Sequence, residues 1–347
     1  LDDEVERLGR LGVEFRCGVA MGADVGLEDL AAEYSAVFVA TGAWRPRPLD
    51  IVGAGLLEPG LEFLESARRG EIELPGGHCA VVGGGNTAMD VARVLRKLGA
   101  EVTVLYRRTA AVMPAIREEY ERALADGVHF QWLTMPRALV KDGSELIVTV
   151  ESTSLGEPDA AGRRRPVPTG TTQSRRFDAV FAATGETADL RPFPASMTDD
   201  TGWLGVAPDG ATSNRHVYAG GDLTTGPATV IDAIAAGRRV ARAIDTDLGF
   251  ADRWPPDTLD TVVAPDEVNP TYVTRRSRVV ETASNGQGAF DEDATTIDEA
   301  AMLAEIERCL SCGHCNACGT CFMFCPDGAI GWDEGPVIDL AFCKGCG

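Results

Sequence analysis

Eight of the ten cysteines lie between Cys309 and Cys346, close to the end of the 347-residue sequence. Four of them follow the spacing CxxCxxCxxxC: Cys315, Cys318, Cys321 and Cys325. Pro326 comes next and completes a run that supplies thiolates to 4Fe–4S clusters in small electron carriers, where the fourth cysteine binds a second cluster. Paired cysteines also bind zinc, but so dense a run ending in Cys-Pro favours iron–sulfur ligation.

Four further cysteines flank this run. Cys343 and Cys346 are predicted to begin a second run of the same kind. Cys309 and Cys312 are surplus to the pattern, and the sequence leaves open whether they bind a cluster. We include all four among the predicted metal ligands, and we interpret His314 as a bystander.

The two remaining cysteines stand alone. Between residues 76 and 187 the sequence has no CxxC pair, where a dithiol-using reductase would carry one, so electrons are expected to leave through the clusters. Cys17, beside a turn, and Cys79, at the start of a buried strand, are interpreted as packing residues.

The segment GGGNTA, residues 83–88, has the glycine spacing of a dinucleotide-binding loop. Gly83 permits the tight turn, Gly85 lets the backbone approach a pyrophosphate, and the small Ala88 lets the helix pack against the strand. The helix N-terminus offers free amides to the pyrophosphate. The predicted ligand-binding residues here are Gly83, Gly84, Gly85, Asn86 and Thr87. The alternative is a purely structural loop.

Two arginines, Arg107 and Arg108, follow the next predicted strand. NAD-binding sites usually carry an acidic residue at this point, whereas arginine can pair with the 2′-phosphate of NADPH. The sequence therefore predicts NADPH rather than NADH. Two arginines on a solvated loop are the alternative.

A second dinucleotide feature is GGD at 220–222, followed by GPAT. An acidic residue after a glycine at a strand end can bind a ribityl hydroxyl of a flavin. A helix that begins near Ala228 would offer amides and the positive end of its dipole. The predicted flavin-binding residues here are Gly221, Asp222, Ala228 and Thr229.

A short repeat marks two strands that end in the same turn. SAVFVATG at 35–42 returns as DAVFAATG at 178–185. Each copy is a short apolar run that ends in Ala-Thr-Gly, which predicts a buried strand followed by a tight glycine turn. Four residues of these turns are also predicted to bind cofactor: Thr41, Gly42, Thr184 and Gly185.

Hydrophobic periodicity places the other elements. The predicted elements are a strand at 80–82, a helix from Ala88 to Leu98 ended by Gly99, a strand at 102–106, a helix over 114–127 with Pro114 in its first turn, strands and a hairpin over 128–182, and a helix over 297–308. A basic cluster within the hairpin, Arg163–Arg165 with Arg175 and Arg176, is interpreted as a solvated surface.

Composition limits the function. Acidic residues outnumber basic ones 53 to 32, which gives a formal net charge of −21 and makes binding to nucleic acid a poor hypothesis. The sequence has no run of about 18 apolar residues that could span a membrane, and its first residues lack the layout of a signal peptide. We therefore expect a cytoplasmic chain with no membrane span.

Together these motifs resemble the glutamate synthase small-subunit family of FAD- and NADPH-binding oxidoreductases, which includes the N-terminal half of dihydropyrimidine dehydrogenase. The resemblance rests on VFVATG at 37–42, VVGGGNTAMDVAR at 81–93, YRRT at 106–109, MPA at 113–115, VFAATG at 180–185, YAGGD at 218–222 and GPATVIDAIAAGR at 226–238.

That resemblance implies an α/β, two-dinucleotide-binding-domain flavoprotein. A Rossmann-like NADPH domain is inserted in a split FAD domain, and a small ferredoxin-like iron–sulfur module follows. The expected boundaries are 1–45 and 188–247 for the FAD domain, 46–75 for a crossing linker, 76–187 for the NAD(P)H domain, 248–300 for a second linker and 301–347 for the iron–sulfur module.

The sequence also departs from the family pattern. It lacks the family's first FAD fingerprint, which is expected before residue 1, and it ends within a cysteine motif, so we expect a fragment that holds FAD poorly alone. Glutamate synthase carries its cysteines at the N-terminus, whereas this chain resembles relatives that end in a ferredoxin-like module.

The expected function is electron transfer from NADPH through FAD to 4Fe–4S clusters, and on to a protein acceptor or a larger oxidoreductase subunit. Hydride transfer depends on positioning rather than on a side-chain acid or base, so we predict no catalytic side chain. One alternative is a glutamate synthase small subunit that serves a glutamine-hydrolysing partner. Another is a non-catalytic iron–sulfur relay subunit.

Overall fold

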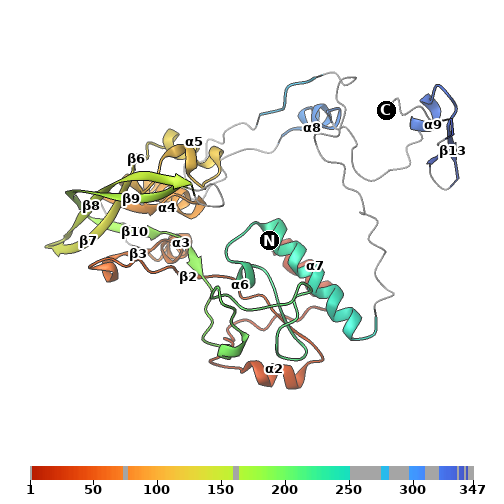
Figure 1. The fold of residues 1–347 in the computed structure, drawn as a ribbon, viewed down its shortest axis with the longest axis horizontal. Helices are drawn as coiled ribbons and strands as arrows, with labels where there is room; N and C mark the ends of the chain where they lie inside the picture. Colours follow the sequence, from red (N-terminus) through yellow and green to blue (C-terminus); the bar gives the residue numbers. More distant parts are fainter. Residues whose placement is uncertain are drawn as a thin grey trace. The chain divides into compact units, whose positions relative to one another are not determined.

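A computed structural model describes residues 2–72, 77–158, 164–250, 275–280, 297–308, 320–333, 336–339 and 341–342. The described residues fall into two compact units, one up to residue 250 and one from residue 275 onward (Figure 1). In the described part of the chain, no helix is both long enough and apolar enough to cross a bilayer.

The first unit contains a parallel sheet with the strand order β3–β10–β4–β5–β6. Its strands are β3 (Glu58–Pro59), β4 (His78–Gly83), β5 (Glu101–Tyr106), β6 (His129–Trp132) and β10 (Ala179–Ala183). The chain passes from β4 through β5 to β6 and then returns to β10 on the other side of β4. The strand order therefore reverses at β4 and β10, the place where open α/β sheets bind their ligands.

Both faces of this sheet are covered, which explains the continuous apolar run in β4. Cys79 and Val81 pack with three helices on one face: α3 (Gly60–Arg69), α4 (Asn86–Lys97) and α5 (Arg117–Ala125). Ala80 and Val82 pack on the other face against a second, antiparallel sheet. Its strands are β7 (Thr134–Asp142), β8 (Glu145–Pro158) and β9 (Arg164–Phe177) (Figure 1). The result is three layers, with the parallel sheet between the helices and the antiparallel sheet.

Helices α4 and α5 are tied together by a nearly buried arginine, and this contact gives a stability prediction. Arg93 is 8% exposed; its Nη1 donates to Glu119 Oε2 at 3.0 Å and its Nε to Asp126 Oδ2 at 2.7 Å. Arg93→Met leaves two partly buried carboxylates without this cation, so we expect a loss of about 2 kcal/mol in urea unfolding.

The matched control is Arg117→Met, in an ion pair within α5. Arg117 pairs with Glu121 at 2.7 Å, but its side chain is 84% exposed, so its loss should cost less than about 0.5 kcal/mol. Equal unfolding free energies for the two variants would show that burial does not strengthen the Arg93 contacts.

The remaining part of the first unit is built on a two-stranded parallel pair. Strand β1 (Val37–Val39) pairs with β12 (Val217–Ala219). Around the pair lie α2 (Leu27–Glu33), α6 (Asp222–Thr225) and α7 (Val230–Asp247), while α1 (Asp2–Arg10) begins the unit. A separate core that includes Leu27, Val39 and Leu223 holds this part together.

Two crossing segments join this part to the parallel sheet. They form the antiparallel pair of β2 (Arg45–Pro46) with β11 (Glu186–Thr187). The amide of Arg47 donates to the Gly185 carbonyl at 2.9 Å, which extends the pair to the second Ala-Thr-Gly turn. The repeated turns of the sequence therefore lie at the two crossings.

The second unit is small. Its elements are α8 (Glu299–Ile306), α9 (Thr320–Phe324), and the antiparallel strands β13 (Ile330–Trp332) and β14 (Pro336–Ile338). The backbone amide of Val279 donates to the Glu305 carboxylate, and Arg276 pairs with Glu307. The predicted helix over 297–308 is thus present, with Asp298 as its N-cap.

Two sequence predictions are wrong in detail. Pro114 does not lie in the first turn of α5, because the amides of Ala115 and Ile116 bond to the Gly84 carbonyl and Asn86 Oδ1 and keep this segment extended. Cys17 is exposed and is not a packing residue.

Candidate functional site

The loop between β4 and α4 shows why its first glycine is needed. Gly83 has φ +149°, and a Cβ on it would lie 2.1 Å from the Ala183 carbonyl oxygen of β10. The same hypothetical Cβ on Gly83 would also lie 3.3 Å from the Cβ of Ala88, which is fully buried. Gly83 is therefore fixed by the close approach of two strands and a helix, independently of any ligand.

The next two glycines differ from each other. A Cβ on Gly84 would lie 2.4 Å from the Tyr106 ring, so packing explains this glycine. Gly85 has extended backbone as the N-cap of α4, and a Cβ there would meet no atom of the described residues within 4 Å. The space above Gly85 is open at the positive end of a helix dipole, which suits an incoming phosphate.

The first turn of α4 carries two polar side chains with different partners. Asn86 Oδ1 accepts a hydrogen bond from the Ile116 amide at 2.9 Å and so anchors the segment before α5. Thr87 Oγ1 donates a long hydrogen bond to Glu186 Oε1 at 3.4 Å. Their backbone amides remain the predicted pyrophosphate donors.

Arg107 and Arg108 lie at the same carboxyl edge of the sheet, after β5. Arg108 Nε donates to the Arg164 carbonyl at 3.1 Å, whereas the Arg107 guanidinium has no hydrogen bond or ion pair within the described residues. Burial lowers the pKa of Arg107, and the charges of Arg108 and Arg47 lower it further. Arg107 is nevertheless exposed, and a reachable cation among like charges favours an anionic partner.

The sequence analysis missed Arg47. It lies in the first crossing segment, and its charge reaches both Arg107 and Glu186. The only sequence signal is the basic segment WRPRP at 44–48, directly after the first Ala-Thr-Gly turn.

The hairpin holds the arginine loop in place. Thr153 Oγ1 of β8 donates to the Arg107 carbonyl at 2.8 Å, and the Arg164 carbonyl of β9 accepts from Arg108. The described arginines of the predicted basic cluster, including Arg175 and Arg176, are exposed on β9, as expected for a solvated surface.

The predicted flavin residues come together after β12. Gly221 has φ +68°, and in the part of the chain that the structure describes a Cβ there would meet no atom within 4 Å. Asp222 Oδ1 accepts from the Ala228 amide at 3.2 Å, and Thr229 caps α7 by accepting from the Asp232 amide at 3.2 Å. This loop places open space, a carboxylate and the start of an 18-residue helix beside one another.

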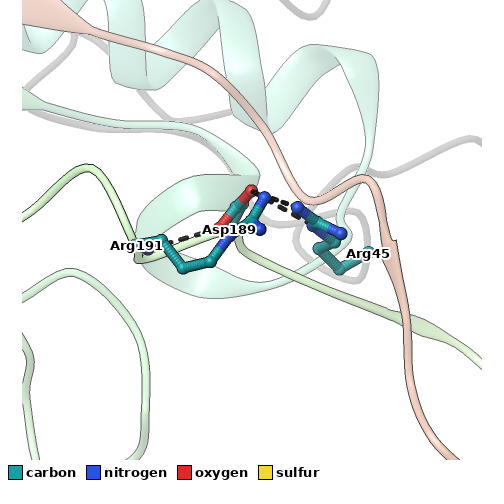
Figure 2. Close-up of polar contacts among 3 residues, drawn as sticks. All are labelled: Arg45, Asp189 and Arg191. Atoms are coloured by element: carbon teal, nitrogen blue, oxygen red, sulfur yellow. Dashed lines mark hydrogen bonds and ion pairs between the residues drawn. The ribbon is translucent and has the colours of Figure 1, made fainter. Parts of the chain in front are cut away.

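The first Ala-Thr-Gly turn borders a cleft of about 250 Å³. Its lining residues are Met21, Thr41, Gly42, Trp44, Arg45, Asp189 and Pro192. Figure 2 shows the Asp189 carboxylate between two guanidinium groups: Arg45 Nη2 donates to it at 2.7 Å and Arg191 Nε at 2.8 Å. Thr184 and Gly185 of the second turn instead contact the Arg47 backbone.

Of the eight predicted metal ligands, Cys309, Cys312, Cys315, Cys318, Cys343 and Cys346 lie outside the described residues. Cys321 is exposed on α9. Cys325 is half-buried, and its Sγ accepts a hydrogen bond from the Ala329 amide at 3.3 Å, the kind of bond that tunes cluster thiolates. Within the described residues, no three side chains gather as metal ligands.

Comparison with known proteins identifies the scaffold. Residues 9–237 match the family described as pyridine nucleotide-disulphide oxidoreductase. Mycobacterium tuberculosis FprA, solved in complex with NADPH, superimposes with a TM-score of 0.58 at 20% identity and covers 68% of each chain. This likeness concerns the fold.

Curated relatives extend the match. The beta subunit of NADP(+)-dependent formate dehydrogenase from Moorella thermoacetica is 37% identical over 90% of this chain and 47% of that protein. NADPH-Fe(3+) oxidoreductase subunit beta from Geobacter sulfurreducens is 33% identical over 90% of this chain and 53% of its own. The glutamate synthase (NADPH) small chain of Escherichia coli K12 is 33% identical over 67% of this chain and 55% of its own. The chain spans between 47% and 55% of the length of these three relatives.

Proposed function

The chain belongs to the pyridine nucleotide-disulphide oxidoreductase family, and from this premise we propose that it takes a hydride from NADPH onto bound FAD and passes electrons to 4Fe–4S clusters and a partner protein. The supporting observation is the edge of the parallel sheet where the strand order reverses. There the open space at Gly85 adjoins the start of α4, and Arg107, whose guanidinium has no partner among the described residues, lies after the neighbouring strand.

The residues at this edge match the two anionic groups of NADPH. The pyrophosphate would bind the α4 amides above Gly85, and the 2′-phosphate would bind Arg107, with Arg108 and Arg47 adding positive charge. Arg107 and Arg47 are exposed and Arg108 is half-buried, so a phosphate from solution can reach all three side chains. The chain's own contribution to the reaction is therefore positioning.

The residues after β12 fit a flavin. Gly221 leaves room for a ligand, Asp222 would accept a hydrogen bond from a ribityl hydroxyl, and the start of α7 would stabilise negative charge on a reduced ring. FAD bound there supplies hydride acceptance and single-electron release. The cleft at Thr41 and Gly42 offers further room beside the same strand pair.

The proposed exit for electrons is the cysteine run. Its spacing favours 4Fe–4S ligation, and Cys325 already accepts an amide hydrogen bond at sulfur. The extent of the matches also favours the electron-transfer subunits, because the formate dehydrogenase subunit beta matches 90% of the chain and the glutamate synthase small chain matches 67%. We therefore favour a subunit of a larger electron-transfer enzyme over a glutamate synthase subunit.

An anaerobic visible spectrum of the protein expressed from the complete reading frame that contains this sequence, taken with NADPH and then with NADH, tests this proposal. We expect flavin and iron–sulfur absorption, both bleached by NADPH and more slowly by NADH. Iron and acid-labile sulfide should be present together, and Cys325→Ser should lower both. A flavin that does not respond to NADPH would contradict the proposal and leave an iron–sulfur relay, and zinc without sulfide would contradict the clusters.

A further inference from the structure

Glu186 is a half-buried carboxylate at the edge where the nucleotide would bind. It is the first residue after the turn that ends β10, and it pairs with Pro46 in the β2–β11 crossing. Its Oε1 accepts the hydrogen bond from Thr87 Oγ1 in the first turn of α4 at 3.4 Å. This carboxylate therefore lies beside the helix that would bind the pyrophosphate.

The hydrogen-bonding capacity of Glu186 is largely unused. A carboxylate has about four acceptor sites, and within the described residues this one has only the long bond from Thr87. Burial raises the pKa of Glu186, the nearby Arg47 charge lowers it, and the Asp222 charge raises it. A partly desolvated acceptor with one long bond is suited to a donor from a ligand.

The topology indicates which part of the ligand reaches Glu186. Arg107 follows β5, on one side of β4, whereas Glu186 follows β10, on the other side. With the 2′-phosphate on the β5 side and the pyrophosphate at α4, the rest of the dinucleotide continues past the end of β10. That remainder is the nicotinamide nucleoside, which carries ribose hydroxyl and carboxamide N–H donors.

We propose that Glu186 accepts a hydrogen bond from the nicotinamide nucleoside of NADPH and so positions the nicotinamide end of the substrate. This inference rests on the proposed function. Asp222 of the flavin loop is close enough for its charge to act on Glu186, so the contact lies on the side of the nucleotide that faces the proposed flavin site.

Two ligands separate this role from a structural one. NADPH has the nicotinamide nucleoside, whereas adenosine 2′,5′-bisphosphate keeps only the adenosine end and its phosphates. Glu186→Ala is expected to raise the Kd for NADPH about tenfold, the loss expected for a hydrogen bond to a charged acceptor. The Kd for adenosine 2′,5′-bisphosphate should change less than about twofold. Glu186→Gln, which keeps an acceptor oxygen, should show an intermediate loss.

Calorimetric titration of the purified protein and its variants measures both constants without turnover. The control is Glu145→Ala, which removes a carboxylate paired with Arg176 in the antiparallel sheet and should change neither constant. Equal weakening of both ligands by Glu186→Ala would show that Glu186 only supports the first turn of α4, and an unchanged Kd for NADPH would also overturn the proposal.

The donor on the ligand is identified by a third titration. The 3-acetylpyridine analogue of NADP+ lacks the carboxamide amino group but keeps the ribose hydroxyls, and it is compared with NADP+ itself. If the Glu186→Ala effect disappears with the analogue, the carboxamide is the donor, and if it persists, the ribose is. Wild-type protein that binds neither NADPH nor adenosine 2′,5′-bisphosphate would instead contradict the proposed function.

Discussion

Replacing Arg107 by glutamine is expected to raise the Kd for NADPH about thirtyfold and to leave the Kd for NADH within about twofold. The Arg107 guanidinium has no partner within the described residues, and burial and two neighbouring arginines lower its pKa. It is therefore poised for a phosphate that only NADPH carries. Arg108→Gln should have a smaller effect, because Arg108 Nε is already bonded to the Arg164 carbonyl.

Arg175→Gln is the matched control for this prediction. It removes the same charge from strand β9, near Phe177, whose ring lies 4.7 Å from that of His78 at the amino end of β4. Arg175 is thus at the opposite edge of the parallel sheet, so both constants should stay unchanged. If Arg107→Gln weakens NADPH and NADH equally, Arg107 does not contact the 2′-phosphate.

The glycine loop between β4 and α4 was predictable as a local element because its residues are adjacent in the sequence. Gly83, Gly85 and Ala88 follow one another on a strand, a turn and a helix, so a spacing pattern records them, although the carbonyl that requires a glycine at Gly83 belongs to Ala183 on the distant strand β10. The same holds for the capped start of α7 at Thr229. Local backbone geometry therefore accounts for the elements that the sequence predicts correctly, and the binding roles of these residues stay predictions.

Arg47 and Glu186 were not predictable in the same way. They reach the site only because β2 and β11, each two residues long, pair across the crossing segments. So short a pair has no periodicity, and its partners are separated by most of the nucleotide-binding part of the chain. Pro114 failed for a similar reason, since a long-range bond from Ala115 to Gly84 overrides its preference for the first turn of a helix.

The loop glycines provide the second large effect, because a methyl group has opposite consequences at Gly83 and Gly85. At Gly83 it would lie 2.1 Å from the Ala183 carbonyl, on a backbone with φ +149°. Strain and overpacking together should destabilise Gly83→Ala by at least about 3 kcal/mol. The melting temperature of the protein without ligand should then fall by about 10 °C.

At Gly85 the same methyl group enters open space, on extended backbone with φ −93° that alanine adopts readily. The stability of Gly85→Ala should stay within about 1 kcal/mol of wild type. Its Kd for NADPH should nevertheless rise about tenfold or more, because the methyl group occupies the approach of the pyrophosphate. Thermal unfolding and calorimetric titration of both variants measure the two effects separately. A Gly85→Ala protein with normal stability and normal NADPH affinity would place the pyrophosphate away from α4, whereas loss of affinity alone would identify Gly85 as the glycine kept open for the nucleotide.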